Sequence, residues 1–120
     1  MAIPDSVPAE CQGVDFDKAL EQLPPQLAER FLVAGEQRLG DLNQAMARND
    51  SLAVMDAAHS LASLTGLLHI QALAAYAQDI YSAAQKGDLD AAQHAHQRLG
   101  IVMGWALGRV RAPGRDATRD

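Results

Sequence analysis

Apolar residues along this chain recur every three or four positions, a spacing that predicts amphipathic helices. The longest pattern runs from Pro25 to about Ala47, and its apolar stripe contains Leu27, Phe31, Leu32, Leu39, Leu42 and Met46. Similar patterns predict helices over about residues 51–68, 71–86 and 88–109. A shorter helix is expected from Asp15, a candidate N-cap, to about Leu23.

Short polar breaks separate the four long patterns. Asp50 or Ser51 is placed to cap one helix and Asp88 the next, with Gly87 as a C′ glycine. Short connections favour antiparallel neighbours. We therefore predict an all-α fold, an antiparallel up-down four-helix bundle with a short N-terminal covering helix. Three apolar side chains of that short helix are expected to lie over Trp105, namely Phe16, Leu20 and Leu23.

The same pattern divides the chain into three parts. Residues 1–14 contain two prolines and little periodicity, and are interpreted as a mobile lead. Residues 15–110 form the predicted bundle. Pro113 and Gly114 interrupt the last pattern, so residues 111–120 are interpreted as a disordered tail.

Composition narrows the function classes. Only 4% of the 120 residues are aromatic, so the core must be built mainly from aliphatic side chains. The net charge is −5 and no basic stripe occurs in the middle of the chain, so nucleic acid is not an expected partner. Cys11 is the only cysteine, which excludes an intrachain disulfide. Without a signal peptide or an apolar run of about 18 residues, we expect a cytoplasmic monomer that contacts no membrane.

His59 is the chemically distinctive residue of the helix predicted over residues 51–68. The apolar stripe of that helix contains Val54, Ala58, Leu61, Thr65 and Leu68, and His59 projects from nearly the opposite side. The residues around it there are Met55, Ala62, Ser63 and Gly66. Most of them are small, so the imidazole should stand clear of its own helix. Neutral imidazole is a competent nucleophile near pH 7.

The other histidines are weaker candidates. His96 lies on the inner stripe of the last helix and is expected in the core, while His69 is interpreted as a cap or turn residue. His94 and His96 are two residues apart and would point to different faces of a helix, so they cannot chelate one metal ion. No metal site and no cofactor is expected.

The sequence around His59 resembles a histidine-containing phosphotransfer (HPt) domain. Ala58-His59-Ser60-Leu61 matches the family's phospho-accepting segment, and Thr65-Gly66-Leu67-Leu68 continues it. Further matches lie upstream at Phe31-Leu32, Leu39, Leu42, Ala45-Met46 and Asn49-Asp50, and downstream at Leu73 and Gly87-Asp88-Leu89. The resemblance covers about residues 15–109.

The resemblance implies a phosphorelay carrier of a two-component signalling system, not a stand-alone enzyme. His59 would accept a phosphoryl group from the phospho-aspartate of a receiver domain and pass it to another response regulator. The implied partners are a response-regulator receiver domain, a hybrid sensor kinase, or both.

Two residues depart from the family pattern. The lysine three positions after the histidine is Ala62 here, and the following glycine is Ser63. In the family that lysine is thought to help hold the phosphoryl oxygens. The alternative is therefore an HPt-like interaction module that binds a receiver or kinase without carrying phosphate. A third possibility is an oligomerisation bundle that buries the His59 face.

Antiparallel pairing around the turn at residues 48–50 brings His59 level with Leu39 and Gly40. We therefore expect a partner-docking surface drawn from two helices. One helix would contribute Met55, Ala62, Ser63 and Gly66, and the preceding helix would contribute Leu39, Gly40, Glu36 and Asn43.

Overall fold

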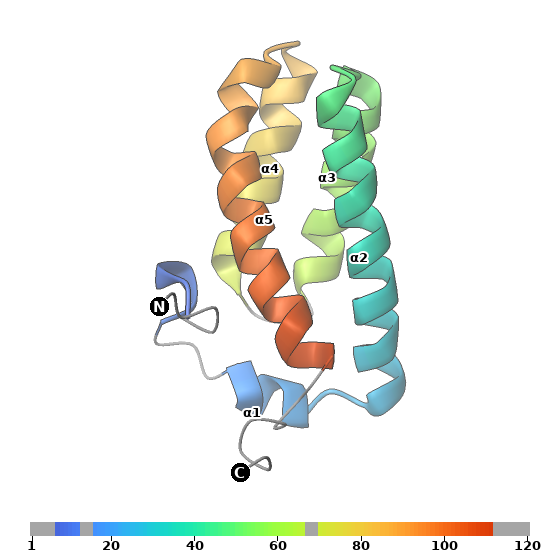
Figure 1. The fold of residues 1–120 in the computed structure, drawn as a ribbon, viewed down its shortest axis with the longest axis vertical. Helices are drawn as coiled ribbons and strands as arrows, with labels where there is room; N and C mark the ends of the chain where they lie inside the picture. The colour runs from blue at the N-terminus through green and yellow to red at the C-terminus, as the bar shows by residue number, and fades with distance from the viewer. Residues whose placement is uncertain (1–6, 13–15, 67–69, 112–120) are drawn as a thin grey trace, which may run out of the picture.

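The computed structural model describes residues 7–12, 16–66 and 70–111, and all regular secondary structure within these ranges is helical (Figure 1). A 3₁₀ turn comes first, followed by one short and four long α-helices. They are η1 (Ala9–Cys11), α1 (Phe16–Glu21), α2 (Pro25–Ala47), α3 (Ser51–Thr65), α4 (Gln71–Gln85) and α5 (Leu89–Arg111). The predicted all-α class is confirmed.

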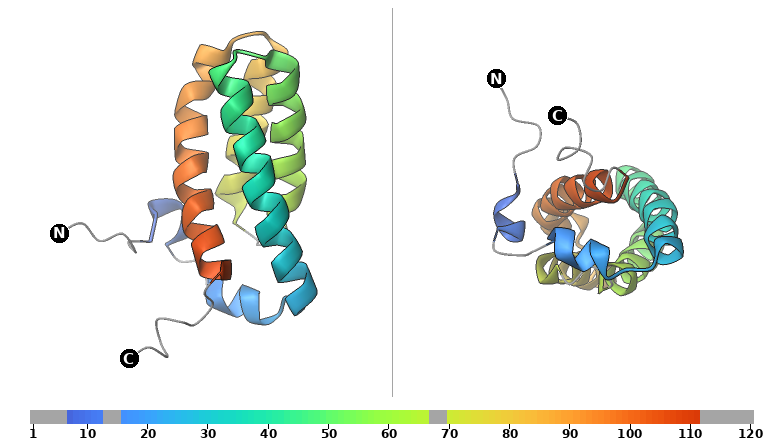
Figure 2. Two further views of the ribbon diagram at one scale, coloured as in Figure 1. Left: turned by 45° about the vertical axis from the view of Figure 1, so that its right-hand side comes forward. Right: turned by 90° about the horizontal axis from the view of Figure 1, so that it is seen from below.

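The four long helices lie side by side along the longest axis of the molecule (Figures 1 and 2). Each packs on two others: α2 and α4 both contact α3 and α5. Seen from below in Figure 2, α1 lies across one end of the helices, next to the start of α2. This arrangement gives α3 two flanks, one facing α2 and the other facing α4.

The helix ends follow the capping residues that the sequence predicts. The Asp50 carboxylate accepts a hydrogen bond from the Ala53 amide at 3.2 Å. Asp88 accepts one from the Ala91 amide at 3.1 Å, and Gly87 before it has φ of 75°, where glycine carries no Cβ penalty. The predicted C-terminal part of the third helix, at Leu67 and Leu68, and the turn at His69 lie outside the described residues.

The core is aliphatic and draws on all four long helices. Its largest fully buried apolar side chains come from each of these helices and from Ile70, the residue before α4. They are Phe31 and Leu42 of α2, Val54 and Leu61 of α3, Leu73 and Ile80 of α4, and Leu99, Val102 and Met103 of α5. Burying a side chain of this size contributes about 1.5–3 kcal/mol. These contacts fix the position of α3 and therefore the position of the side chains on its outer face.

The short helix α1 covers Trp105 as predicted. The ring centroids of Phe16 and Trp105 are 5.2 Å apart, and Phe16 is buried. Leu20 and Leu23 pack against the core beside it. On Trp105 there also lies the guanidinium group of Arg109, 5.9 Å from the ring centroid.

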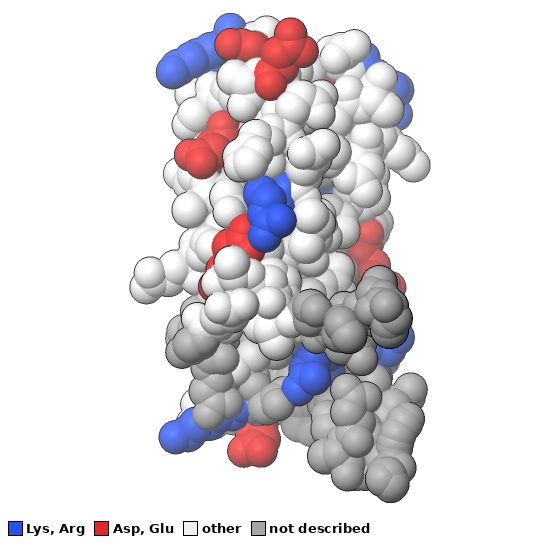
Figure 3. All heavy atoms as spheres, turned by 60° about the vertical axis from the view of Figure 1, so that its left-hand side comes forward, with Lys and Arg blue, Asp and Glu red and all other residues white. Residues whose placement is uncertain are grey.

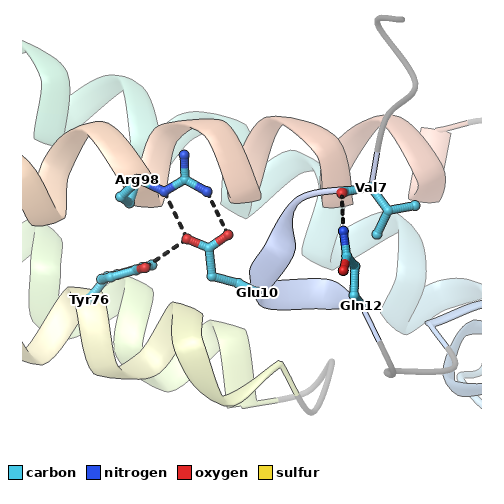
Figure 4. A network of polar contacts seen from close by, with 5 residues as sticks. All are labelled: Val7, Glu10, Gln12, Tyr76 and Arg98. Carbon is cyan, nitrogen blue, oxygen red and sulfur yellow. Dashed lines mark hydrogen bonds and ion pairs between the residues drawn. The ribbon is translucent and has the colours of Figure 1, made fainter.

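Residues 7–12 pack on the bundle, which differs from the mobile lead that the sequence suggested for residues 1–14. The Glu10 carboxylate accepts hydrogen bonds from Tyr76 Oη at 2.7 Å and from Arg98 Nε and Nη2 at 2.8 and 2.6 Å (Figure 4). These bonds, led by that to Arg98, lower the pKa of Glu10 to about 2. We call Glu10, Tyr76 and Arg98 the N-terminal clasp. Next to it, Cys11 is buried, and burial raises the pKa of its thiol.

Candidate functional site

His59 lies in the middle of α3 and is exposed, as the sequence predicts. The residue before it, Ala58, and Leu61 two positions after it are fully buried against the neighbouring helices. Because successive residues on a helix are rotated by about 100°, burial of these two directs the imidazole away from the core. The backbone that carries His59 is thus fixed by packing while its ring remains accessible.

The neighbour of the His59 ring is Tyr81 of α4. Their ring centroids are 6.1 Å apart, with an interplanar angle of 50°. Tyr81 is half-buried and borders the surface. Among the described residues, no hydrogen bond or ion pair to the His59 ring is found. His59 therefore lies on the flank of α3 that faces α4.

Sequence reasoning missed this tyrosine, although a signal for it was present. Pairing α3 and α4 antiparallel across the turn before Gln71 brings the region of Tyr81 level with His59. The spacing of apolar residues in α4 indicates only which side of that helix is buried, at Leu73, Ala77 and Ile80.

The four predicted docking residues of α3 share the outer part of that helix with His59. Met55 and Ala62 are half-buried, whereas Ser63 and Gly66 are exposed. A Cβ added to Gly66 would meet no atom within 4 Å, so the backbone there is open to an approaching partner. Helical spacing places these four residues on the same side of the helix as His59.

The α2 half of the predicted surface is directed elsewhere. Glu36 forms an ion pair with Arg111 of α5. The side-chain oxygen of Asn43 is hydrogen-bonded to His96 Nε2 of α5 at 2.8 Å. Both side chains therefore lie on the flank of α2 that faces α5.

Leu39 and Gly40 belong to this flank as well. They lie three or four residues from both Glu36 and Asn43, a spacing that places all four on one side of a helix. Leu39 is half-buried and packs against the core. The structure does not bring this set together with His59. Antiparallel pairing gives the height of a residue along the bundle, but it does not tell toward which neighbour the side chain points.

His96 is not the core residue that the sequence suggested. It is half-buried, and the hydrogen bond to Asn43 satisfies one of its ring nitrogens. Partial burial lowers the pKa of this histidine, because the charged form loses more solvation than the neutral form. His96 thus links α2 and α5 through this hydrogen bond.

The charge around His59 is acidic. No Lys or Arg occurs between Arg48 and Lys86, so α3 and α4 contain acidic residues, Asp56 and Asp79, but no cationic side chain. Arg38 of α2 and Arg48, which follows α2, line a groove of about 190 Å³ with Asp56 between α2 and α3. That groove lies on the other flank of α3 from Tyr81. A phosphoryl group on His59 would therefore receive no cation from its own helix or from α4.

The wider surface shows no concentration of positive charge on the face drawn in Figure 3, where Lys and Arg side chains are scattered among Asp and Glu. Within the described ranges no three His, Cys, Asp or Glu side chains are grouped as metal ligands. Of the helices described, none is both long and apolar enough to cross a membrane.

Comparison with known protein families identifies the family to which the chain belongs. The model of the Hpt domain family matches residues 26–109, more than half of the chain. The chain belongs to the Hpt domain family. Hpt domains are phosphocarriers that take part in histidine phosphotransfer in two-component signalling, and they interact with receiver domains and kinases. No characterised protein and no solved structure matches the chain.

Proposed function

We propose that this Hpt domain is a phosphorelay carrier in which His59 accepts a phosphoryl group from the phospho-aspartate of a receiver domain and passes it to another response regulator. The observation that carries the proposal is the exposed imidazole of His59 on a helix whose other side is locked in the core. We further propose that the fold is an antiparallel four-helix bundle and that the protein acts as a monomer in the cytoplasm.

On the carrier's side, the proposed phosphoryl transfer requires only the imidazole of His59. The lone pair of one neutral imidazole nitrogen attacks phosphorus, the P–O bond to the receiver's aspartate breaks, and the aspartate carboxylate leaves with the electron pair. The other ring nitrogen keeps its proton, and reversal of the same step hands the phosphoryl group on. An exposed imidazole that accepts or donates no hydrogen bond among the described residues suits both directions.

The docking surface in this proposal consists of the α3 residues around His59, which are Met55, Ala62, Ser63 and Gly66. Small or flexible side chains around a reactive centre let a partner's active site approach the imidazole closely. Glu36, Leu39, Gly40 and Asn43 are left out because their flank of α2 faces α5.

One observation favours the alternative, an interaction module that binds a receiver or kinase without carrying phosphate. Neither α3 nor α4 supplies a cation for a phosphoryl group that carries close to two negative charges. In the carrier, that charge has to be balanced by the partner during transfer.

Incubation with a phosphorylated receiver domain separates the two functions. The carrier should acquire phosphate that is labile in acid and stable in base, and His59→Gln should abolish this uptake. The free energy of unfolding of this glutamine variant should lie within about 0.5 kcal/mol of that of the wild type, since His59 is exposed. His94→Gln, at another exposed histidine, is the matched control and should retain uptake. Binding of the receiver without phosphate uptake would establish the interaction module, and uptake that persists in His59→Gln would exclude His59 as the acceptor.

A further inference from the structure

The ring contact between His59 and Tyr81 joins two helices at the candidate site. His59 comes from α3 and Tyr81 from α4, and these helices lie side by side (Figures 1 and 2). The centroid separation of 6.1 Å with a tilt of 50° falls in the range of attractive aromatic pairs.

Apart from this ring contact, no polar contact to the His59 side chain is found within residues 7–12, 16–66 and 70–111. The residue is exposed, its neighbour one turn later is the small Ala62, and within the described part of the chain no hydrogen bond holds the imidazole. Tyr81, in contrast, is half-buried and stands on a helix whose neighbouring Ile80 is fully buried. The Tyr81 side chain packs against the core, and its ring lies on one side of the imidazole.

We propose that Tyr81 is a positioning residue for the chemistry of His59, holding the imidazole by ring contact so that its reactive nitrogen faces outward. The inference rests on the proposed phosphorylation of His59. Nucleophilic attack needs the ring nitrogen in line with the bond that breaks, so a ring that samples fewer orientations reacts faster. This matters here because α3 and α4 hold no Lys or Arg to draw the phosphoryl group into place.

The test uses phosphoramidate, a small donor that involves no partner protein. The imidazole attacks its phosphorus, the P–N bond breaks, and ammonia leaves; formation of phospho-His59 is followed by ³¹P NMR. Tyr81→Leu, which keeps apolar bulk but not the ring, should react about three- to tenfold more slowly, a range that an aromatic pair can supply. Tyr81→Phe keeps the ring and should stay within about twofold of the wild type. Ser82→Ala, at an exposed residue of α4, is the control and should react like the wild type.

A spectroscopic measurement tells positioning from mere structural support. The ring protons of His59 should shift in Tyr81→Leu and keep their wild-type positions in Tyr81→Phe, because the ring current of the tyrosine is lost only in the first. Thermal melting of each variant shows that it is folded under the conditions of the reaction.

The outcomes separate the two claims. Equal rates for Tyr81→Leu and wild type would overturn the inference, and so would a Tyr81→Phe variant as slow as Tyr81→Leu, since the hydroxyl would then be the group that acts. A wild type in which His59 reacts with neither phosphoramidate nor a phosphorylated receiver would overturn the proposed function itself.

Discussion

At the level of single residues, the electrostatics of His59 set this domain apart from the family pattern. Ala62 stands one turn after His59, where the family pattern has a lysine, and it is half-buried beside the imidazole. Asp56, one turn before, is exposed and adds negative charge. A dianionic phosphoryl group on His59 is thus less favourable than it would be beside a cation.

Ala62→Lys should raise the equilibrium fraction of phospho-His59. A lysine at this position can lay its aliphatic stem along the helix and bring its ammonium group to the phosphoryl oxygens. We expect about a two- to fivefold gain, which corresponds to about 0.5–1 kcal/mol at an exposed site. Partition of phosphate between receiver and carrier at low salt measures it.

High salt provides the control for this prediction. Because the new contact is exposed, the gain should shrink as ionic strength rises. An unchanged partition at low salt would show that another group already serves the phosphate, with Ser63 as the nearest candidate on α3.

At the level of helices, local sequence signals account for where each element begins and ends. α2 has the predicted bounds, Pro25–Ala47, and carboxylate caps begin α3 and α5 where the sequence places them. Two glycines have opposite roles. Gly87 lies in the turn between α4 and α5 and has a positive φ, whereas Gly104 lies inside α5, and a Cβ added there would meet no atom within 4 Å.

The two glycines make a matched pair for a stability prediction. Gly104→Ala should stabilise the fold by about 0.5–1 kcal/mol, because alanine loses less conformational freedom in a helix and an added Cβ meets no atom within 4 Å. Gly87→Ala should destabilise it by about 1 kcal/mol, because φ is 75° there and an L-residue is strained. Urea denaturation measures both. Destabilisation by Gly104→Ala would contradict this prediction and would mean that the surface of α5 at Gly104 is packed against another molecule or segment in solution.

At the level of the whole molecule, contacts distant in sequence hold the N-terminal segment, residues 7–12 and α1, on the long helices. Phe16 packs on Trp105 at one end, and the N-terminal clasp ties residue 10 to α4 and α5. The clasp is a charge-assisted pair with little solvent contact at Glu10, whose side chain is 12% exposed.

Breaking the clasp should expose Cys11. Glu10→Ala removes all three hydrogen bonds, so we expect the Cys11 thiol to react with a thiol reagent at pH 8 at least about tenfold faster, through local opening of residues 7–12. The pKa of Glu10 is lowered to about 2 from 4.5, so its contribution is complete above pH 4.5 and is lost as the pH falls toward 2. Labelling at pH 8 therefore compares a complete clasp with none.

Glu21→Ala is the matched control, since Glu21 is an exposed glutamate of α1. It should leave Cys11 as slow to react as in the wild type. Equal reactivity in Glu10→Ala and wild type would show that burial of Cys11 does not depend on the clasp.

Sequence periodicity determined the number and kind of helices, most of their ends, and the exposure of His59 on α3. These features follow from interactions within a few residues: spacing of apolar positions, side-chain caps and the conformational freedom of glycine. Only the tertiary structure decided which side chains from other helices lie beside His59. Sequence pairing predicted that Leu39 and Gly40 lie level with His59, yet Glu36 and Asn43 of the same flank contact α5, while Tyr81 of α4 contacts the imidazole. The direction of a helix flank depends on how all four helices rotate to bury their stripes together, and no single stripe contains that information.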